Sequence, residues 1–243
     1  MEMAHTLEAA EDFKRTLEEV DILLGDADAA GEDECKLGVM NKSAVLLLMG
    51  KFEAFLESAI EEYLFAISSL GARASHIPER LLLQHSVESV REIEIVLNKN
   101  DLAKVKRVFT DLGRLWAEAA PCDSLKVTSA FDYGSHGENE VCKLFKRVGF
   151  DKVFTLVEVS DESEDLAEGE HQAIVDVAGI INSLTCMRNN ILHENASPSL
   201  TTNWIRQQRN ILSRFADGLV ALFEKSVDET KARIQTGANT DGS

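Results

Sequence analysis

Residues 41–70 read NKSAVLLLMGKFEAFLESAIEEYLFAISSL. Large apolar residues in this stretch return every three or four positions, which is the spacing of one face of an α-helix. They fall at i, i+4, i+7, i+8, i+11 and i+15, at Leu48, Phe52, Phe55, Leu56, Ala59 and Tyr63. Gly71 follows directly, and glycine is typical of the position just after a helix end. We therefore expect a long helix at the centre of the core.

The helical pattern continues on both sides of this segment. An acidic amphipathic helix is expected over residues 4–24, and the acidic stretch from Gly25 to Gly38 predicts a loop. Further helices are expected at residues 79–97, 101–119, 140–148, 171–193 and 201–234. Residues 123–139 predict an irregular insertion, and residues 152–159 predict a helix or a loop. The chain thus predicts an all-α fold, a helical bundle with additional helices and an irregular insertion.

The composition fits a globular protein that can bury a core. Hydrophobic residues make up 44% of the 243 residues and charged residues 28%, and both values are ordinary for globular domains. We expect three parts: an acidic N-terminal helix and loop at residues 1–37, a helical domain at residues 38–235, and a disordered tail at residues 236–243.

The sequence lacks the features that mark several classes of protein. The N-terminus has neither the basic nor the apolar region of a signal peptide. The longest apolar run, residues 44–49, is far shorter than the roughly 20 residues that span a bilayer. The four cysteines form no CxxC pair, and the chain carries no GxxxxGK[ST], GxGxxG or HExxH motif. We therefore expect a cytoplasmic protein with free thiols and with no membrane segment, metal or cofactor.

The net charge of −17 argues against broad adhesion to nucleic acid, because proteins that adhere in this way present a basic face. The charge is uneven along the chain. Residues 1–35 carry −10, whereas residues 181–216 carry +3. We therefore expect the acidic segments 1–35 and 161–170 to lie away from any site built by residues 181–216.

Within that basic region, the segment Arg188-Asn189-Asn190-Ile191-Leu192-His193 ends the helix expected at residues 171–193. Imidazole titrates near neutral pH, so it can take a proton from a ribose 2′-hydroxyl or give one to a leaving oxygen. Guanidinium stays charged and can bind two phosphate oxygens at once. This combination suits phosphodiester cleavage without a metal.

Helical geometry gives this segment only part of a site. Five residues rotate by about 500° and rise by about 7.5 Å, so Arg188 and His193 lie about 140° apart around the helix. Asn189 and His193 are an i,i+4 pair on one face, where the amide can orient the imidazole. One helix therefore offers half a site, and a second copy facing it would supply the other half.

Less specific interpretations remain open at this point. Arg80 and His85 have the same spacing, and arginine or histidine at a helix end often caps carbonyl groups. His136 is expected to be an ordinary loop histidine, because a zinc site needs at least three such ligands. Two interpretations of Glu53 are open, a residue that faces the site and a solvated glutamate, and the second is favoured because carboxylates are rarely buried without a partner.

The segment from Ile181 to His193 resembles the signature of the HEPN superfamily, in which an arginine, a polar residue and then a histidine lie near the end of a core helix. Asn41–Phe55, with its Phe-Glu pair, and Gly134–Phe150 resemble bacterial HEPN ribonucleases of the RiboL-PSP-HEPN type, found in defence and toxin systems. The resemblance covers about residues 38–225, and its specific part is the Arg188-to-His193 segment.

This resemblance implies a HEPN-type helical bundle that dimerises to bring two Arg/His pairs together and cleaves RNA without a metal. It makes Arg188 and His193 catalytic and Asn189 the supporting polar residue. Glu194 departs from the family pattern, because a glycine or another small residue follows the histidine in many members. The glutamate places a negative charge beside the site.

The leading hypothesis is a homodimeric, metal-independent endoribonuclease of a toxin or antiviral system, with RNA as substrate and a cognate antitoxin or defence protein as partner. The alternative is a catalytically silent HEPN module that binds RNA, nucleotide or a protein partner, which the acidic composition and Glu194 favour. A helical scaffold, in which the segment only caps a helix, is the third hypothesis.

Overall fold

The computed structural model describes residues 7–98, 101–132, 136–160, 173–193 and 200–240. These ranges contain no β-strand apart from a single bridge between Ser160 and Ile174, and none of their helices is both long and apolar enough to cross a membrane. The helices are α1 (Ala9–Asp28), α2 (Glu34–Ser69), the short 3₁₀ helix η1 (Ala74–His76), α3 (Glu79–Leu97), α4 (Leu102–Trp116), α5 (Glu138–Arg147), α6 (Val153–Leu156), α7 (Val177–His193) and α8 (Thr202–Thr240). The prediction of an all-α fold is confirmed.

The first loop is much shorter than expected. Helix α1 continues through Gly25, and α2 begins at Glu34, so only residues 29–33 separate the two helices. Asp33 caps α2, because its carboxylate accepts a hydrogen bond of 3.0 Å from the backbone N–H of Lys36. The prediction of a loop from Gly25 to Gly38 is wrong, since both glycines lie within helices. Packing of these helices against the core outweighs the low helix propensity of glycine.

Two boundaries near the C-terminus also differ from expectation. Helix α7 begins at Val177 and not near residue 171; residues 173–176 are not helical, and residues 171–172 lie outside the described ranges. The Asp176 carboxylate accepts a hydrogen bond of 2.9 Å from the Gly179 backbone N–H, which fixes this start. Helix α8 continues to Thr240, so residues 236–240 of the expected disordered tail are helical.

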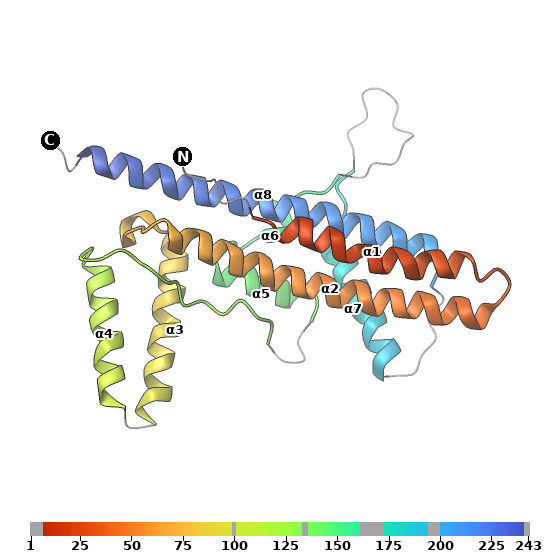
Figure 1. Ribbon diagram of the computed structural model, residues 1–243, viewed down its shortest axis with the longest axis horizontal. Coiled ribbons are helices and arrows are strands. Elements are labelled where there is room, and N and C mark those ends of the chain that lie inside the picture. The colour runs from red at the N-terminus through yellow and green to blue at the C-terminus, as the bar shows by residue number, and fades with distance from the viewer. Residues whose placement is uncertain (1–6, 99–100, 133–135, 161–172, 194–199, 241–243) are drawn as a thin grey trace.

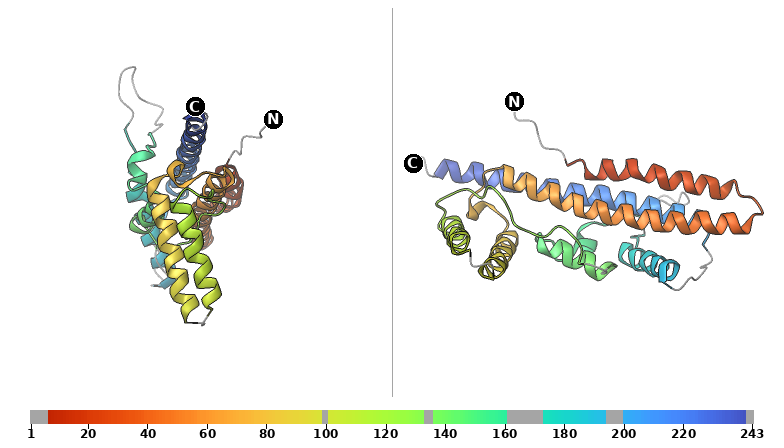
Figure 2. Two further views of the ribbon diagram at one scale, coloured as in Figure 1. Left: turned by 90° about the vertical axis from the view of Figure 1, so that its left-hand side faces the viewer. Right: turned by 60° about the horizontal axis from the view of Figure 1, so that its bottom comes forward.

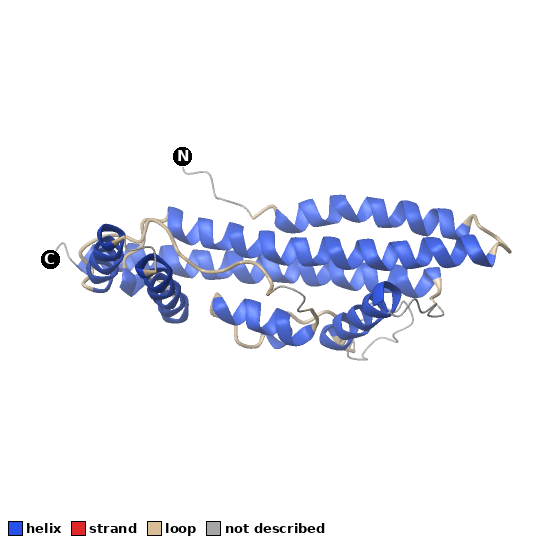
Figure 3. Ribbon diagram, turned by 90° about the horizontal axis from the view of Figure 1, so that it is seen from below, coloured by secondary structure: helices blue, strands red, loops and turns tan. Residues whose placement is uncertain are grey.

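The three long helices α1, α2 and α8 lie side by side along the long axis of the molecule (Figure 1). Helices α5 and α7 lie on the side of α2 and α8 that faces away from α1 (Figure 2, right, and Figure 3). Helices α3 and α4 form a hairpin that projects from one end of the layer. This arrangement holds α7 against α2 and lets its C-terminal turn extend beyond the layer.

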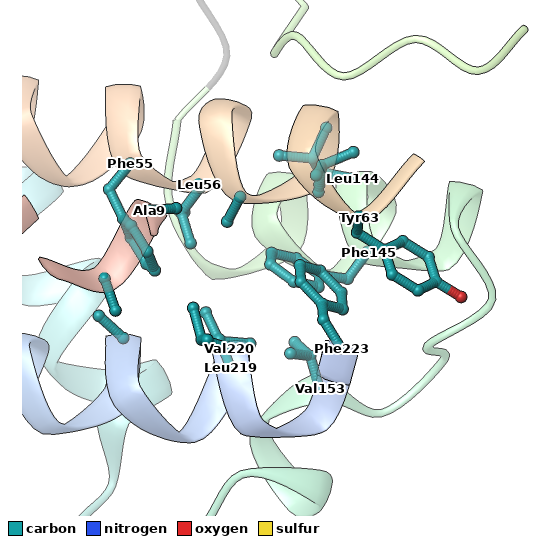
Figure 4. Packing of buried hydrophobic residues seen from close by; sticks show 14 of the residues in the cluster. Ala9, Phe55, Leu56, Tyr63, Leu144, Phe145, Val153, Leu219, Val220 and Phe223 are labelled. Atoms are coloured by element: carbon teal, nitrogen blue, oxygen red, sulfur yellow. The ribbon is translucent and has the colours of Figure 1, made fainter. Parts of the chain in front are cut away.

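The apolar face predicted for α2 is the centre of the core, and all six of its predicted residues are buried. The ring of Tyr63 stacks on Phe223 of α8 with centroids 4.6 Å apart, and Phe223 lies 5.7 Å from Phe145 of α5 (Figure 4). Burying an aromatic side chain such as Phe contributes about 1.5–3 kcal/mol. Burial also raises the pKa of Tyr63 to about 12, so its hydroxyl stays neutral beside Ser226 (2.9 Å).

Ion pairs join the acidic helix α1 to the basic part of α8. Arg206 lies 2.7 Å from Asp28, and Arg209 lies 2.7 Å from Asp21. Both arginines belong to the segment 181–216 that carries the local positive charge, and both aspartates belong to the acidic segment 1–35. Part of the charge asymmetry in the sequence is therefore neutralised within the bundle.

Candidate active site

Helix α7 is anchored through the first part of its length. The helical spacing of the sequence predicts one apolar side made of Ile174, Val177, Ala178, Ile181, Leu184 and Ile191. Val177, Ile181 and Leu184 of this set are buried, as predicted. Ile174 was expected on the same apolar side, but it precedes the helix and is 63% exposed. The last turn of α7 differs from this anchored part, because Arg188 and Asn189 are half-buried and His193 is exposed. The polar end of α7 therefore lies at the surface while its apolar start holds it in place.

A cleft with a volume of about 870 Å³ lies beside this polar end. Its walls come from α2, from the segment before α5 and from the last turn of α7. The polar residues that line it are Glu53, Glu57, Asp132, His136, Arg188, Asn189 and His193. The three residues predicted as a site thus line one cleft, together with side chains that lie far away in the sequence.

Arg188 is available for an external anion. Its guanidinium forms no ion pair or hydrogen bond within the part of the chain that the structure describes. The other arginines of this region are engaged, because Arg206 and Arg209 pair with α1 and Arg214 donates a hydrogen bond of 2.7 Å to the backbone oxygen of Ser160. A charged group that faces an open cleft can bind carboxylate or phosphate oxygens without giving up another contact.

Two of the carboxylates in the cleft already have partners. Glu57 accepts a hydrogen bond of 2.9 Å from the backbone N–H of Phe131. Asp132 forms an ion pair of 3.2 Å with Arg147. The first contact holds Phe131 onto α2, and the second joins Asp132 to the end of α5. Both contacts reduce the negative charge that the cleft presents to a ligand.

The third carboxylate, Glu53, lies against His136. Glu53 Oε1 is 2.7 Å from His136 Nδ1, and the two side chains are 21% and 19% exposed. Both atoms are shielded from solvent, yet they are not aligned for a well-formed hydrogen bond. Glu53 thus faces the cleft, which is the less favoured of its two interpretations, and His136 also lines the cleft, which its sequence position did not indicate.

A sequence signal for the cleft does exist on α2. Gly50, Glu53, Ala54 and Glu57 are spaced at i, i+3, i+4 and i+7, so they form one stripe next to the buried face. The two small residues leave space between the helices, and the two glutamates line that space. A stripe that alternates small and acidic residues beside an apolar face is therefore what could have identified Glu53.

The loop that carries His136 is fixed to α7. Asn182 Oδ1 accepts a hydrogen bond from the Glu138 backbone N–H (2.9 Å), and Asn182 Nδ2 donates one to the Glu138 carboxylate (2.8 Å). Gly137, which separates His136 from Glu138 in the chain, has a φ of 98°, and a Cβ at this position would lie 3.1 Å from Asn182 Oδ1. Glycine at this position allows the close approach, which sets His136 at a defined place relative to α7.

The second Arg/His spacing has a structural explanation. Arg80 forms a surface ion pair of 2.8 Å with Asp151. His85 is buried, its Nδ1 accepts a hydrogen bond of 2.8 Å from the Lys126 backbone N–H, and burial lowers its pKa. Neither residue lines the cleft beside α7. Arg80 and His85 therefore contribute to the fold and not to this site.

Three further expectations concern the surroundings of the cleft. None of residues 7–35 lines it, whereas residues 161–170 and Glu194 lie outside the described ranges. Within the described ranges, Asn189 and His193 form no hydrogen bond with each other, although the helix places them four residues apart. Those ranges also contain no group of three or more His, Cys, Asp or Glu side chains placed to hold a metal ion.

A family model described as RiboL-PSP-HEPN matches residues 11–225 of the chain. Comparison with curated proteins found no match, and neither did comparison with solved structures. The matched range runs from α1 into α8 and includes every residue that lines the cleft. HEPN families are generally associated with ribonucleases, and HEPN domains commonly bind RNA and dimerise. With this match over most of its length and an all-α fold, the chain belongs to the RiboL-PSP-HEPN family, one of the HEPN families.

Proposed function

We propose that the protein is an endoribonuclease that cleaves RNA by attack of a ribose 2′-hydroxyl on the adjacent phosphate, without a metal ion. The observation that carries this proposal is the cleft in which Arg188, free of ion-pair partners among the described residues, lies with Asn189 and His193. A free guanidinium and an exposed imidazole at the end of one anchored helix are the groups that this reaction requires.

The chemistry uses one proton acceptor, one proton donor and one positive charge. A neutral imidazole takes the proton of the 2′-hydroxyl while the 2′-oxygen forms a bond to phosphorus. The bond from phosphorus to the 5′-oxygen breaks, and a protonated imidazole gives its proton to that oxygen. Arg188 stabilises the negative charge that builds on the phosphate oxygens. The products are a 2′,3′-cyclic phosphate and a 5′-hydroxyl, and no water is consumed.

The acidic composition of the protein does not prevent RNA from reaching this cleft. Exposed charges more than about 8–10 Å apart are largely screened at physiological salt, so the charges near the phosphate matter most. Glu57 and Asp132 are engaged with the protein, and Glu53 lies against an imidazole. The described part of the acidic N-terminal segment contributes nothing to the cleft wall.

The experiment that tests this proposal is incubation of the purified protein with single-stranded RNA in EDTA. We expect cleavage, products that end in a 2′,3′-cyclic phosphate, and no cleavage at a position that carries deoxyribose. Mass spectrometry of the product ends distinguishes this chemistry from metal-assisted hydrolysis, which leaves a linear phosphate. Cleavage that stops in EDTA, or that continues at the deoxyribose position, contradicts the proposal.

We also propose a homodimer with two-fold symmetry whose interface includes α7. Helix α7 carries one Arg188/His193 pair per chain, and its polar end is at the surface, where a two-fold axis brings two such pairs together. Light scattering at micromolar concentration should give twice the mass of one chain. A monomer at that concentration, or a dimer with the two His193 residues on opposite outer surfaces, contradicts it.

The biological setting that we propose follows the family resemblance. The enzyme acts in the cytoplasm as the toxin or effector of a toxin or antiviral defence system, and a cognate antitoxin or defence protein controls it. Co-purification of the chain with a neighbouring gene product that suppresses RNA cleavage is the observation that supports this setting.

A second candidate function rests on the carboxylates of the cleft. Glu53, Glu57 and Asp132 all line it, and a silent HEPN module that binds RNA, a nucleotide or a protein partner tolerates such groups better than a ribonuclease does. Binding of RNA in EDTA without any cleavage favours this second function over the first.

A further inference from the structure

A second groove lies next to the cleft, between the neighbouring helices α3 and α5 (Figure 1). Its volume is about 630 Å³. Basic side chains outnumber acidic ones in its lining, where Arg80, Arg91, Lys143, Lys146 and Arg147 surround Asp132. Asp132 also lines the cleft, so the groove and the cleft meet at this residue. We call this feature the basic groove.

We propose that the basic groove binds the phosphate backbone of the RNA strand beyond the nucleotides held in the cleft, through Arg91, Lys143 and Lys146. This inference rests on the proposed function, with RNA as the substrate, and adds the surface that holds the rest of the strand. The strand continues from the cleft past Asp132 and then lies between α3 and α5.

Two of these cations face outward while their acidic partners lie behind them. The side chain of Arg91 is 66% exposed and that of its partner Glu88 is 17% exposed. Lys143 and its partner Glu140 show the same difference, with 63% and 16%. Neither glutamate lines the groove. Because solvent screens such ion pairs and they stabilise the protein little, both cations can contact phosphate oxygens.

The third cation, Lys146, has no ion pair in the part of the chain that the structure describes, and its ammonium group forms no hydrogen bond there. Its orientation follows from the pattern of α5, which buries Val141, Leu144 and Phe145. Lys143 and Lys146 are three residues apart on the other side of this helix, and both are exposed. The helix therefore directs two ammonium groups into the groove.

The other two arginines of the groove have local partners that leave less charge for a ligand. Arg147 is 20% exposed and donates hydrogen bonds to the Ala130 backbone oxygen (2.8 Å) and to Asp132. It therefore joins α5 to the segment where the groove meets the cleft. Arg80 pairs with Asp151, and both side chains are about half exposed. This pair presents no net charge, so we do not assign Arg80 to RNA binding.

The position and the charge of the groove favour nucleic acid as its ligand. The protein carries a net charge of −17, yet this surface presents cations and adjoins a cleft in which Arg188 is free to bind a phosphate. A single strand of RNA carries a phosphate at every nucleotide, so one molecule can occupy both places. Contacts to phosphate position a strand but do not read its sequence. We therefore expect the groove to bind RNA of any sequence.

The test compares wild-type protein with the triple variant Arg91→Gln, Lys143→Gln and Lys146→Gln. Fluorescence anisotropy measures its binding to a long 2′-O-methyl RNA, which attack by a 2′-hydroxyl cannot cleave, over a series of KCl concentrations. The slope of log affinity against log salt should fall in magnitude by about 2, because each phosphate contact on a single strand contributes about 0.7. On cleavable RNA at low salt, KM should rise by about tenfold or more with kcat unchanged.

The matched control is the triple variant Arg15→Gln, Lys36→Gln and Lys225→Gln. It removes the same charge from three exposed residues that line neither the groove nor the cleft. It should bind RNA as wild-type protein does. If the groove variant does not fold by circular dichroism, Lys146→Gln alone takes its place, because its ammonium group has no partner among the described residues. Its salt slope should fall by about 0.7.

The outcomes separate this inference from the proposed ribonuclease activity. Wild-type affinity and salt slope in the groove variant, with RNA cleaved by wild-type protein, overturn the groove as an RNA site and leave the ribonuclease proposal intact. An equal loss of affinity in the control variant shows a general effect of charge and also overturns the groove. A reduced slope in the groove variant alone, with wild-type protein that cuts no RNA, supports the groove and overturns the ribonuclease. Wild-type protein that neither binds nor cuts RNA overturns both proposals.

Discussion

His193→Ala should lower the rate of RNA cleavage by about 10²–10⁴-fold, the range that a positioned general acid or base contributes. The imidazole is exposed and lies in the last turn of α7, beyond the residues that anchor the helix. Its removal opens no cavity in the core and breaks no hydrogen bond among the described residues. The change should therefore affect the chemical step and leave the helical content and the mass of the proposed dimer as they are.

Single-turnover cleavage of a labelled RNA in EDTA measures this effect, with circular dichroism as the check on folding. His76→Ala is the better control than a change at His85, because the buried Nδ1 of His85 accepts a backbone hydrogen bond whose loss destabilises the protein. If His193→Ala cleaves at the wild-type rate, then the imidazole of α7 takes no part in proton transfer and the catalytic groups lie elsewhere.

Periodicity predicted the helices well and their ends poorly. The apolar face of α2 was identified correctly because six residues at helical spacing must all be buried together. The loop between α1 and α2 was predicted about three times too long, since glycines and acidic residues mark a loop only where packing does not hold them in a helix. The start of α7 depends on a single capping contact from Asp176, which no periodic pattern contains.

The candidate site was predicted in part for the same reason. Arg188, Asn189 and His193 lie within one turn and a half of one helix, so their proximity follows from local geometry. Glu53 and His136 are 83 residues apart in the sequence, and their contact depends on how the segment before α5 crosses α2. Sequence spacing gives no information on such a crossing, which is why His136 was expected to be an ordinary loop histidine and a solvated position was favoured for Glu53.

The charge pattern was informative but incomplete. The excess of arginine in residues 181–216 suggested a basic surface, yet Arg206 and Arg209 form ion pairs with α1. The negative net charge of the chain also says little about the charge of the cleft, because the acidic helix α1 lies on the side of α2 and α8 that faces away from α7 (Figure 3). The charge of the cleft is therefore set by the groups that line it, which are Arg188, two imidazoles and three carboxylates.

Arg188→Ala should lower kcat by about 10²–10³-fold, similar to the loss of one donor that stabilises an anionic transition state. The guanidinium has no ion-pair partner among the described residues, so it is free to bind the phosphate oxygens, and it binds them more strongly in the transition state, where they carry more negative charge. Arg188→Lys keeps the charge but loses the paired donors that bind two phosphate oxygens at once. We therefore expect an intermediate kcat for the lysine variant.

The matched control for this change is Arg80→Ala, which removes an arginine from the other copy of the same sequence spacing. Arg80 pairs with Asp151 at the surface, and exposed ion pairs contribute only about 0–1 kcal/mol, so its loss should leave both folding and cleavage unchanged. Measuring kcat and KM separately then decides what Arg188 does. A raised KM with an unchanged kcat means that it only binds RNA, whereas a lower kcat means that its charge acts in the transition state. Loss of cleavage in Arg80→Ala together with normal cleavage in Arg188→Ala would move the active site to the other Arg/His pair.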